Sequence, residues 1–286
     1  MPVHVPRRLA VCAVAAVLAG AAAACGATSS TASSSASPSP AAATGAKTIT
    51  YSRVVDLAHV ISPDIPLWPG DPEVVFKTVA TMKKDGYYLR SFTIGEHSAT
   101  HMNAPNSFIA GDTRSITSYP AEQLVVPAAV IDVREQCASD PDYQLSRQDV
   151  LDWEAANGQL APGTFVIMYT GWQDKWSDPE AFFNIDGKGN LHFPGFAGAT
   201  TTWLLSDRQI AGAGIDTHGV DPGLDTSYAT NTQTTGAHKI VIECLGNLDQ
   251  LPATGATLVL GILRLKDGSG TPLSVMAFVP WPDFRS

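Results

Sequence analysis

The sequence predicts an α/β domain that is rich in β-strand, and three observations support this fold class. From residue 48 onward, short runs of β-branched and aromatic residues recur between clusters of Gly, Pro, Asn and Asp. Only the stretches 146–158 and 197–209 have helical character. The region 48–286, about 240 residues, has a suitable length for a single domain.

The expected strands follow one another along this region. The first, 48–61, ends at the turn Ser62-Pro63-Asp64. The next segment, 67–72, contains two prolines and a glycine and must be a loop, in which Trp68 either packs locally or lines a pocket. The remaining expected strands share a high content of Val, Ile, Phe, Tyr and Thr: 73–82, 87–102, 125–133, 163–172, 210–217, 239–245, 257–265 and 273–279.

Two helices interrupt the strands. Ser146, followed three residues later by Asp149, has the pattern of a capping box, so we expect a helix from there to Asn157-Gly158. The second helix is expected over 197–209.

The amino-terminal residues predict export. Arg7 and Arg8 precede an apolar run, 9–24, that is too short to span a membrane comfortably and ends in small residues before Cys25. We therefore expect a lipoprotein-type signal peptide at 1–24, lipidation of Cys25, and an extracytoplasmic protein. Simple secretion is the alternative, because a usual lipobox has a larger aliphatic residue at the position of Ala22. The Ala, Ser, Thr and Pro composition of 25–47 predicts a disordered tether.

The charge of the chain limits the classes of partner, and the cysteine content bears on disulfide formation. The chain has 18 Lys and Arg against 27 Asp and Glu, which argues against nucleic acid and leaves a small-molecule substrate and a lipid anchor as the expected partners. Cys137 and Cys244 are the cysteines of the folded part, and a disulfide between them is compatible with the sequence but not required.

One segment, 96–108, carries the strongest chemical signal. In an extended chain, alternate side chains point to the same side, so His97, His101 and Asn103 would project together past the small Ala99. Neutral imidazoles and an amide oxygen suit a divalent ion such as zinc or manganese. The spacing of the two histidines alone is also compatible with ordinary packing.

The order of the motifs resembles the cyclase family, which includes arylformamidases (kynurenine formamidases) and isatin hydrolases. Family members carry Asp-Leu-Ser-His, Trp-Pro-Gly-Asp-Pro, His-x-Gly-Thr-His-x-Asp-Ala-Pro-x-His-Phe, Thr-Gly-Trp, Gly-Ile-Asp-Thr and Glu-Asn-Leu-x-Asn-Leu. This chain has, in the same order, Asp56-Leu57-Ala58-His59, Trp68-Pro69-Gly70-Asp71-Pro72, the His97 segment, Thr170-Gly171-Trp172, Gly214-Ile215-Asp216-Thr217 and Glu243-Cys244-Leu245-Gly246-Asn247-Leu248.

The resemblance implies a single swivelling β/β/α domain, homo-oligomeric assembly, and hydrolysis of amides or cyclic amides with one divalent ion, zinc or manganese. It implies metal binding by His97, His101 and the position of Asn103, where the family has Asp. Ser107 stands where the family has a histidine that transfers protons, and Asn231 stands where it has another histidine. His238 would reach that second position only with a gap in the alignment.

Because Ser107 and Asn231 stand where the family has histidines, another residue must act as the catalytic base, and the pocket residues must be chosen separately. Glu243 follows the apolar run 240–242, where a buried carboxylate needs a metal or another partner, so it is a candidate ligand and catalytic residue. His218 and Ser107 are the other catalytic candidates, although a histidine at a strand end is often a surface residue. The expected pocket residues are Trp68, Trp172 and Asn231, whereas His59 and His192 are expected to be structural or exposed.

Three functions follow from these residues. The first is an exported metal-dependent hydrolase of a small amide, lactam or ester, acting on C–N bonds other than peptide bonds. The second is a binding protein that keeps the pocket but has lost the base. The third is a metal-free lyase or cyclase of secondary metabolism, in which Asn103, Ser107 and Asn231 orient the substrate.

Overall fold

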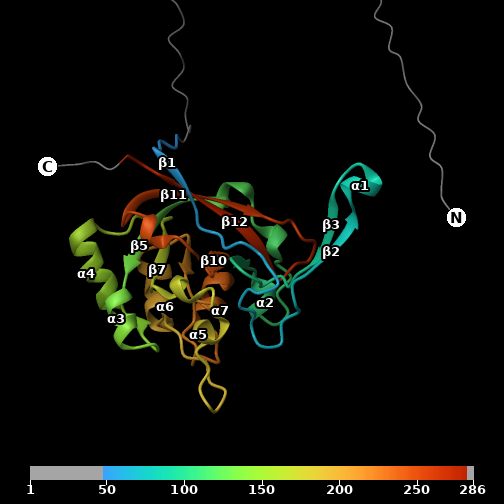
Figure 1. The fold of residues 1–286 in the computed structure, drawn as a ribbon. Helices are drawn as coiled ribbons and strands as arrows, with labels where there is room; N and C mark the ends of the chain where they lie inside the picture. Colours follow the sequence, from blue (N-terminus) through green and yellow to red (C-terminus); the bar gives the residue numbers. More distant parts are fainter. Residues whose placement is uncertain (1–47, 282–286) are drawn as a thin grey trace, which may run out of the picture. The chain divides into compact units, whose positions relative to one another are not determined.

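Seven strands form a closed sheet at the centre of the domain, and the computed structural model describes it over residues 48–281 (Figure 1). The order is β12, β11, β5, β7, β9, β10 and β4, and β4 pairs with β12 to close the ring. Their bounds are β4 His101–Asn103, β5 Val125–Asp132, β7 Phe165–Tyr169, β9 Gly212–Ile215, β10 Ile240–Glu243, β11 Thr254–Ile262 and β12 Gly270–Val279. The eighth strand, β1 (Arg53–Asp56), pairs with the carboxyl-terminal part of β12.

The parallel part of the sheet determines where the functional side chains gather. β5, β7, β9 and β10 run parallel to one another, so their carboxyl ends lie at the same edge. Alternate residues of these strands pack in two separate clusters. Phe165, Ile167 and Ile242 belong to the cluster inside the ring, whereas Val166 and Met168 pack with residues of α4 and α6 on the outside.

Helices cover this outer face, and both predicted helices are present. α4 (Arg147–Asn157) begins with the predicted capping box of Ser146 and Asp149, and α6 is Gly198–Asp207. Two more helices, α3 (Arg134–Ser139) and α7 (Ala229–Gly236), were not predicted, because neither has a clear apolar period. The shorter helices are α1 Met82–Asp85, α2 Pro105–Phe108 and α5 Pro179–Phe183.

The predicted strand 87–102 is wrong as a single element. It consists of β3 (Leu89–Thr93), a turn, and β4. β3 pairs with β2 (Val75–Ala80) in a separate two-stranded sheet that projects from the body of the domain (Figure 1). The strand expected at 48–61 is limited to β1, and a further small sheet joins β6 (Gln144–Leu145) to β8 (Gly195–Phe196).

The other expectations about the chain have mixed outcomes. The β-rich α/β fold class is confirmed. Cys137 and Cys244 are both buried and both free thiols. The signal peptide, the lipidated Cys25 and the tether lie outside the described residues. No helix within residues 48–281 has the length and apolar character to cross a membrane.

Candidate active site

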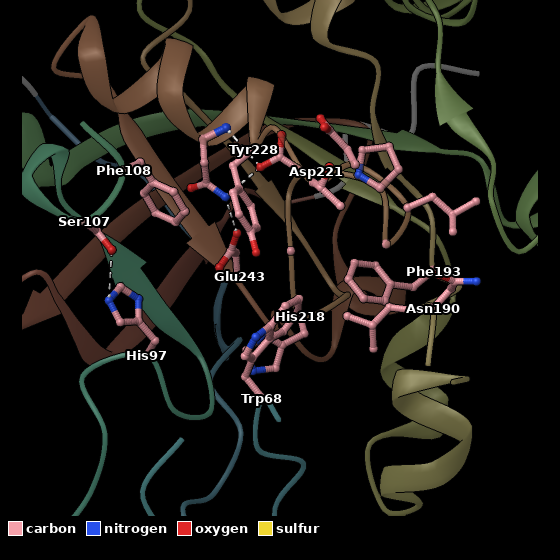
Figure 2. Close-up of a pocket in the computed structure, with 18 of the residues that line it drawn as sticks. Trp68, His97, Ser107, Phe108, Asn190, Phe193, His218, Asp221, Tyr228 and Glu243 are labelled. Atoms are coloured by element: carbon pink, nitrogen blue, oxygen red, sulfur yellow. Dashed lines mark hydrogen bonds between the residues drawn. The ribbon is translucent and has the colours of Figure 1, made fainter. Parts of the chain in front are cut away.

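A cavity of about 360 Å³ opens beside β4 and β10, and most of the predicted site residues line it (Figure 2). Its walls come from segments that are far apart in the sequence: the loop before β2, the turn before β4, α2, the loops 189–193 and 218–228, α7 and β10. The predicted residues that line it are Trp68, His97, His101, Ser107, His218, Asn231 and Glu243.

His97 and His101 meet in the cavity, but for a different reason from the one predicted. His97 lies in a turn rather than in a strand, and Ala99 between the two histidines has a left-handed φ of 55°. This turn reverses the chain so that the two imidazole centroids lie 5.3 Å apart, nearly perpendicular to each other. The predicted alternation of strand side chains is therefore wrong for His97, although the convergence it was used to predict is present.

The strand pairing places Glu243 against His101. These residues lie opposite each other in the antiparallel pair of β10 and β4, and His101 Nε2 is 3.0 Å from Glu243 Oε2. Burial raises the pKa of Glu243, but the hydrogen bond and charge of His101, helped by donors from Asn231 and the Val220 amide, outweigh it and lower the pKa to about 2. Glu243 is therefore an ionised carboxylate inside the cavity wall.

Two buried amides connect His97 to the carboxylates. Asn231 Nδ2 donates to Asp221 Oδ2 and to Glu243 Oε1, each at 2.9 Å. Because carboxylates only accept, the Asn231 oxygen must face the other way, where it accepts from Asn103 Nδ2 at 2.8 Å. The Asn103 oxygen then faces His97 Nδ1 at 2.8 Å. Asn103 and Asn231, at the positions where the resemblance implies Asp and His, thus form one continuous hydrogen-bonded chain with His97 and the carboxylates.

Asp221 is a site residue that the sequence analysis missed. It lines the cavity, is 3% exposed, and accepts backbone hydrogen bonds from Thr230 and Asn231. Burial raises its pKa to about 6 despite these donors. The signal that pointed to it is weak: an acidic residue before Pro222-Gly223, five residues after Asp216 in the Gly-Ile-Asp-Thr motif.

His218 faces the cavity rather than the surface. Its side chain is 5% exposed, and its ring packs against Trp68 and Phe183 with centroid separations of 5.2 Å each. Its buried Nε2 has no hydrogen-bond partner among residues 48–281. Burial lowers the pKa of His218 to about 3, so the imidazole is uncharged at neutral pH. A buried polar atom without a partner in a cavity wall is available to a ligand.

Ser107 lies beside the second nitrogen of His97. Figure 2 shows its hydroxyl directed at His97 Nε2, at 3.4 Å. Ser269, which was not predicted, is closer to the same nitrogen at 3.0 Å, and its hydroxyl also lies 2.7 Å from Glu96 Oε2. A serine has one hydroxyl proton to donate, so if Ser269 donates to Glu96, Ser107 is the remaining donor to His97.

Two expected contributors lie elsewhere. Trp172 does not line the cavity: it is 3% exposed, packs with Phe182 and Phe193, and its indole donates to the Phe182 carbonyl. His238 does not fill the place of the missing histidine, because it stacks on Tyr119 and hydrogen-bonds with Ser118. His59 and His192 also lie outside the cavity, as expected: His59 stacks on Trp176, and His192 pairs with Asp142 and Asp186.

The donor atoms of the site fit one divalent ion. The Ala99 carbonyl accepts from His101 Nδ1 at 2.9 Å, so His101 Nε2 faces Glu243 Oε2. A proton on Nε2 satisfies this pair, and a bound cation would take the place of that proton. The atoms that would hold such an ion are His101 Nε2 and Glu243 Oε2, which lie 3.0 Å apart, and His97 Nδ1 and Asn103 Oδ1, which lie 2.8 Å apart. No three His, Cys, Asp or Glu side chains within residues 48–281 are grouped as a metal site, and the Asn103 oxygen is the further donor that lies beside His97.

Comparisons with known proteins agree with this architecture. The Cyclase family model matches residues 55–222. The isatin hydrolase of Roseibium aggregatum is 32% identical over 253 residues, covering 82% of this chain and 95% of the relative. The kynurenine formamidase of Salinibacter ruber is 24% identical, covering 80% and 99%. The solved structure of isatin hydrolase A from Labrenzia aggregata bound to benzyl benzoate superimposes with a TM-score of 0.75 at 31% identity, covering 80% of this chain and 94% of that one.

This chain therefore belongs to the cyclase family. The resemblance stated from its motifs is confirmed over nearly the whole described domain. The relative that is 32% identical is an isatin hydrolase, and a kynurenine formamidase is also similar, which supports a hydrolase that acts on amide bonds.

Proposed function

We propose that this protein is a metal-dependent hydrolase that cleaves the C–N bond of a small aryl amide or lactam, or the C–O bond of an analogous ester. The observation that carries the proposal is the facing pair of His101 Nε2 and Glu243 Oε2 in the wall of a cavity of about 360 Å³. The similarity to isatin hydrolase and to kynurenine formamidase supports an amide carbonyl as the reacting group.

The aromatic wall supports a planar substrate. Trp68, Phe108, Phe193 and Tyr228 line the cavity, and their side chains surround its open space in Figure 2. Aromatic walls bind an aryl ring by packing and orient its polar substituents toward the few polar groups present. His218 Nε2 has no partner among the described residues, so it would accept a hydrogen bond from the substrate N–H.

The ion would be held by His97 Nδ1, His101 Nε2, Asn103 Oδ1 and Glu243 Oε2, and we expect zinc or manganese. When bound, it supplies Lewis acidity toward the carbonyl and toward water. The amide of Asn103 contributes less charge than the family's carboxylate, so we expect weaker binding of the ion than in relatives that keep the Asp.

Asp221 is the candidate proton acceptor in place of the missing histidine at position 107. It lies in the cavity wall with a pKa of about 6, close to the value at which a base works best at neutral pH. The hydrogen-bonded Asn231 fixes the carboxylate toward the cavity. Ser107 then contributes a hydrogen bond rather than a base.

Activity toward defined substrates tests the proposal. The purified protein, supplied with zinc or manganese, should convert an aryl lactam such as isatin, or an aryl formamide, to the ring-opened or deformylated product. His101→Ala should lower kcat/KM at least about 100-fold, whereas His238→Ala, a histidine outside the cavity, should leave it unchanged. Lack of turnover with lactams, formamides and aryl esters alike would contradict the proposal.

One observation favours a second candidate, a metal-free lyase or cyclase. The chain from Glu243 through Asn231 and Asn103 to His97 satisfies each of its amide groups without an ion. Ser107, His97 and Asn103 then follow the order of hydroxyl, imidazole and orienting group. Activity that survives exhaustive treatment with a chelator would support this candidate against the first.

We also propose that the protein is exported and held at the membrane by a lipid on Cys25. The support is the sequence of two arginines, an apolar run and small residues before this cysteine. Metabolic labelling with a radioactive fatty acid should mark the wild-type protein and not Cys25→Ser. Recovery of the unlabelled wild-type protein in the cytoplasmic fraction would contradict both parts.

A further inference from the structure

The charged side chains that line the candidate active site are all acidic. Four carboxylates line the cavity, those of Asp71, Asp221, Asp225 and Glu243, and none of the described Lys or Arg residues does. A bound divalent ion would supply two positive charges, and imidazoles that hold an ion are uncharged. The four carboxylates exceed the charge of the ion, so the cavity attracts a cationic ligand and repels an anionic one.

One of the four carboxylates is free to bind a ligand. Asp221, Asp225 and Glu243 each face three hydrogen-bonding groups of the domain. Asp71 takes part in hydrogen bonds among the described residues only through its backbone amide. Its half-buried side chain therefore reaches the cavity with both carboxylate oxygens available.

A tight turn fixes Asp71 beside an aromatic side chain. The Asp71 amide donates to the Trp68 carbonyl at 2.9 Å, and between them stand Pro69 and Gly70, which has a φ of 97°. Proline at the second position and a positive φ at the third are typical of a type II turn. Trp68 and Asp71 are thus the two ends of one turn, and both line the cavity. The face of an indole also attracts an ammonium group.

This turn lies near the groups that would react with the substrate. Figure 2 shows the ring of Trp68 beside that of His218, and their centroids lie 5.2 Å apart. His218 is 5% exposed, and no described residue hydrogen-bonds its Nε2, which is an unfilled position for a ligand in the same wall. Burial lowers the pKa of His97, and Asp71 is close enough to oppose that shift. A ligand that fills this part of the cavity therefore lies next to the turn.

From these observations we infer that the Asp71 carboxylate binds a protonated amine of the substrate, with the indole of Trp68 packed against the same group. The substrate is then an aryl amide or lactam that carries a positive charge. Its class depends on the hydrolase activity proposed above, to which Asp71 adds a preference for charge. A carboxylate at the same place on the substrate would be repelled by the acidic wall.

Kinetics with three matched compounds test this role of Asp71 in the purified protein supplied with zinc or manganese. Formanilides with a para aminomethyl, hydroxymethyl or carboxymethyl group differ in one substituent, which is positive, neutral or negative. We expect kcat/KM to fall at least about 10-fold from the first to the second, because a hydrogen bond to a charged group is lost. The third compound should be poorer again. The same substituents at position 5 of isatin provide the lactam series.

Asp71→Asn should bring the ratio of the first two kcat/KM values to about one, mainly through a higher KM for the aminomethyl compound. Asp64→Asn is the matched control, because it removes the same charge from an exposed residue outside the cavity and should leave the ratio unchanged. Asp71→Lys should reverse the order of the aminomethyl and carboxymethyl compounds. Circular dichroism should show that all three variants keep the wild-type spectrum.

The outcomes separate the role of Asp71 from the hydrolase activity. Equal kcat/KM for the three compounds, or a preference that Asp71→Asn leaves intact, would overturn the role of Asp71 and leave the hydrolase in place. If no compound is hydrolysed, the proposed function fails, and equilibrium binding of the same compounds, followed by NMR, decides the role of Asp71. Tighter binding of the aminomethyl compound that is lost in Asp71→Asn would support it, and equal binding would overturn it.

Discussion

Two buried carboxylates, Glu243 and Asp216, lie at similar places in the fold but have different hydrogen-bond partners. Each lies at the carboxyl end of a parallel strand, Glu243 in β10 and Asp216 directly after its neighbour β9. Glu243 faces the cavity and His101. Asp216 is fully buried and accepts hydrogen bonds from the Thr170 amide and hydroxyl and from the Gln173 amide.

The surroundings of these two residues shift their pKa values in opposite directions. An imidazole and two further donors keep Glu243 ionised, with a pKa of about 2. Burial outweighs the hydrogen bonds to Asp216 and raises its pKa to about 6. Glu243 therefore faces the cavity in which we propose catalysis, whereas Asp216 of the Gly-Ile-Asp-Thr motif holds the backbone and hydroxyl of Thr170 and the amide of Gln173.

The largest effect should follow from Glu243→Gln. The substitution keeps the shape but removes the charge that faces His101, so we expect kcat/KM to fall about 10²–10³-fold with little change in the secondary structure. Steady-state kinetics and circular dichroism measure the two quantities. A variant with near wild-type activity would mean that Glu243 is as structural as Asp216.

Asp221→Asn should produce the next largest effect. The asparagine cannot accept a proton, so kcat should fall about 10²-fold. In the wild-type protein a base with a pKa of about 6 must be ionised to act, so kcat should rise from pH 5 to pH 7 and then level off. That rise should be absent from the pH profile of Asp221→Asn, and its persistence would exclude Asp221 as the base.

Ser107→His tests whether an imidazole at this place in the cavity increases the rate of reaction. Ser107 is exposed at the cavity wall, and the resemblance of the motifs implies a histidine at this position. We expect kcat to rise about 10-fold, since a well-placed base contributes at least that much. Ser107→Asn is the control, because asparagine is polar and similar in size to histidine but has no basic group. An equal rise in both variants would point to a packing effect.

Asp216→Asn should affect stability instead of chemistry. The variant loses acceptor capacity for buried donors, which should cost about 1–3 kcal/mol of unfolding free energy, while kcat of the folded protein stays close to wild type. Chemical denaturation measures the first quantity. A kcat loss as large as that of Glu243→Gln would show that the two carboxylates do not differ in role.

The contribution of Asp216 to the unfolding free energy should decrease as the pH rises. Because the folded pKa of about 6 lies above the ordinary aspartate value of 3.8, the folded chain keeps the Asp216 proton where the unfolded chain loses it. The contribution of this group is complete below about pH 4 and is lost as the pH rises through 6. Asp216→Asn should therefore remove a decrease in unfolding free energy between pH 4 and pH 6.

The same residues show what the sequence was able to predict. The strands and the capped helix α4 follow from local patterns, and His97, His101 and Glu243 were found from motifs. The closure of the sheet was not predictable, because it depends on β4 meeting β12 across more than 160 residues. Asp221 and Ser269 were missed because they lie on loops whose position depends on that closure. Trp172 was wrongly predicted to line the cavity, because the Thr-Gly-Trp motif instead hydrogen-bonds Asp216 through Thr170.

Metal content is the measurement that tests the central claim most directly. The purified protein, incubated with zinc or manganese and freed of excess ion, should contain about one equivalent by elemental analysis. His97→Ala, His101→Ala and Glu243→Gln should lose it, whereas His238→Ala should retain it. Absence of bound ion from the wild-type protein under these conditions would contradict the account and favour the metal-free candidate.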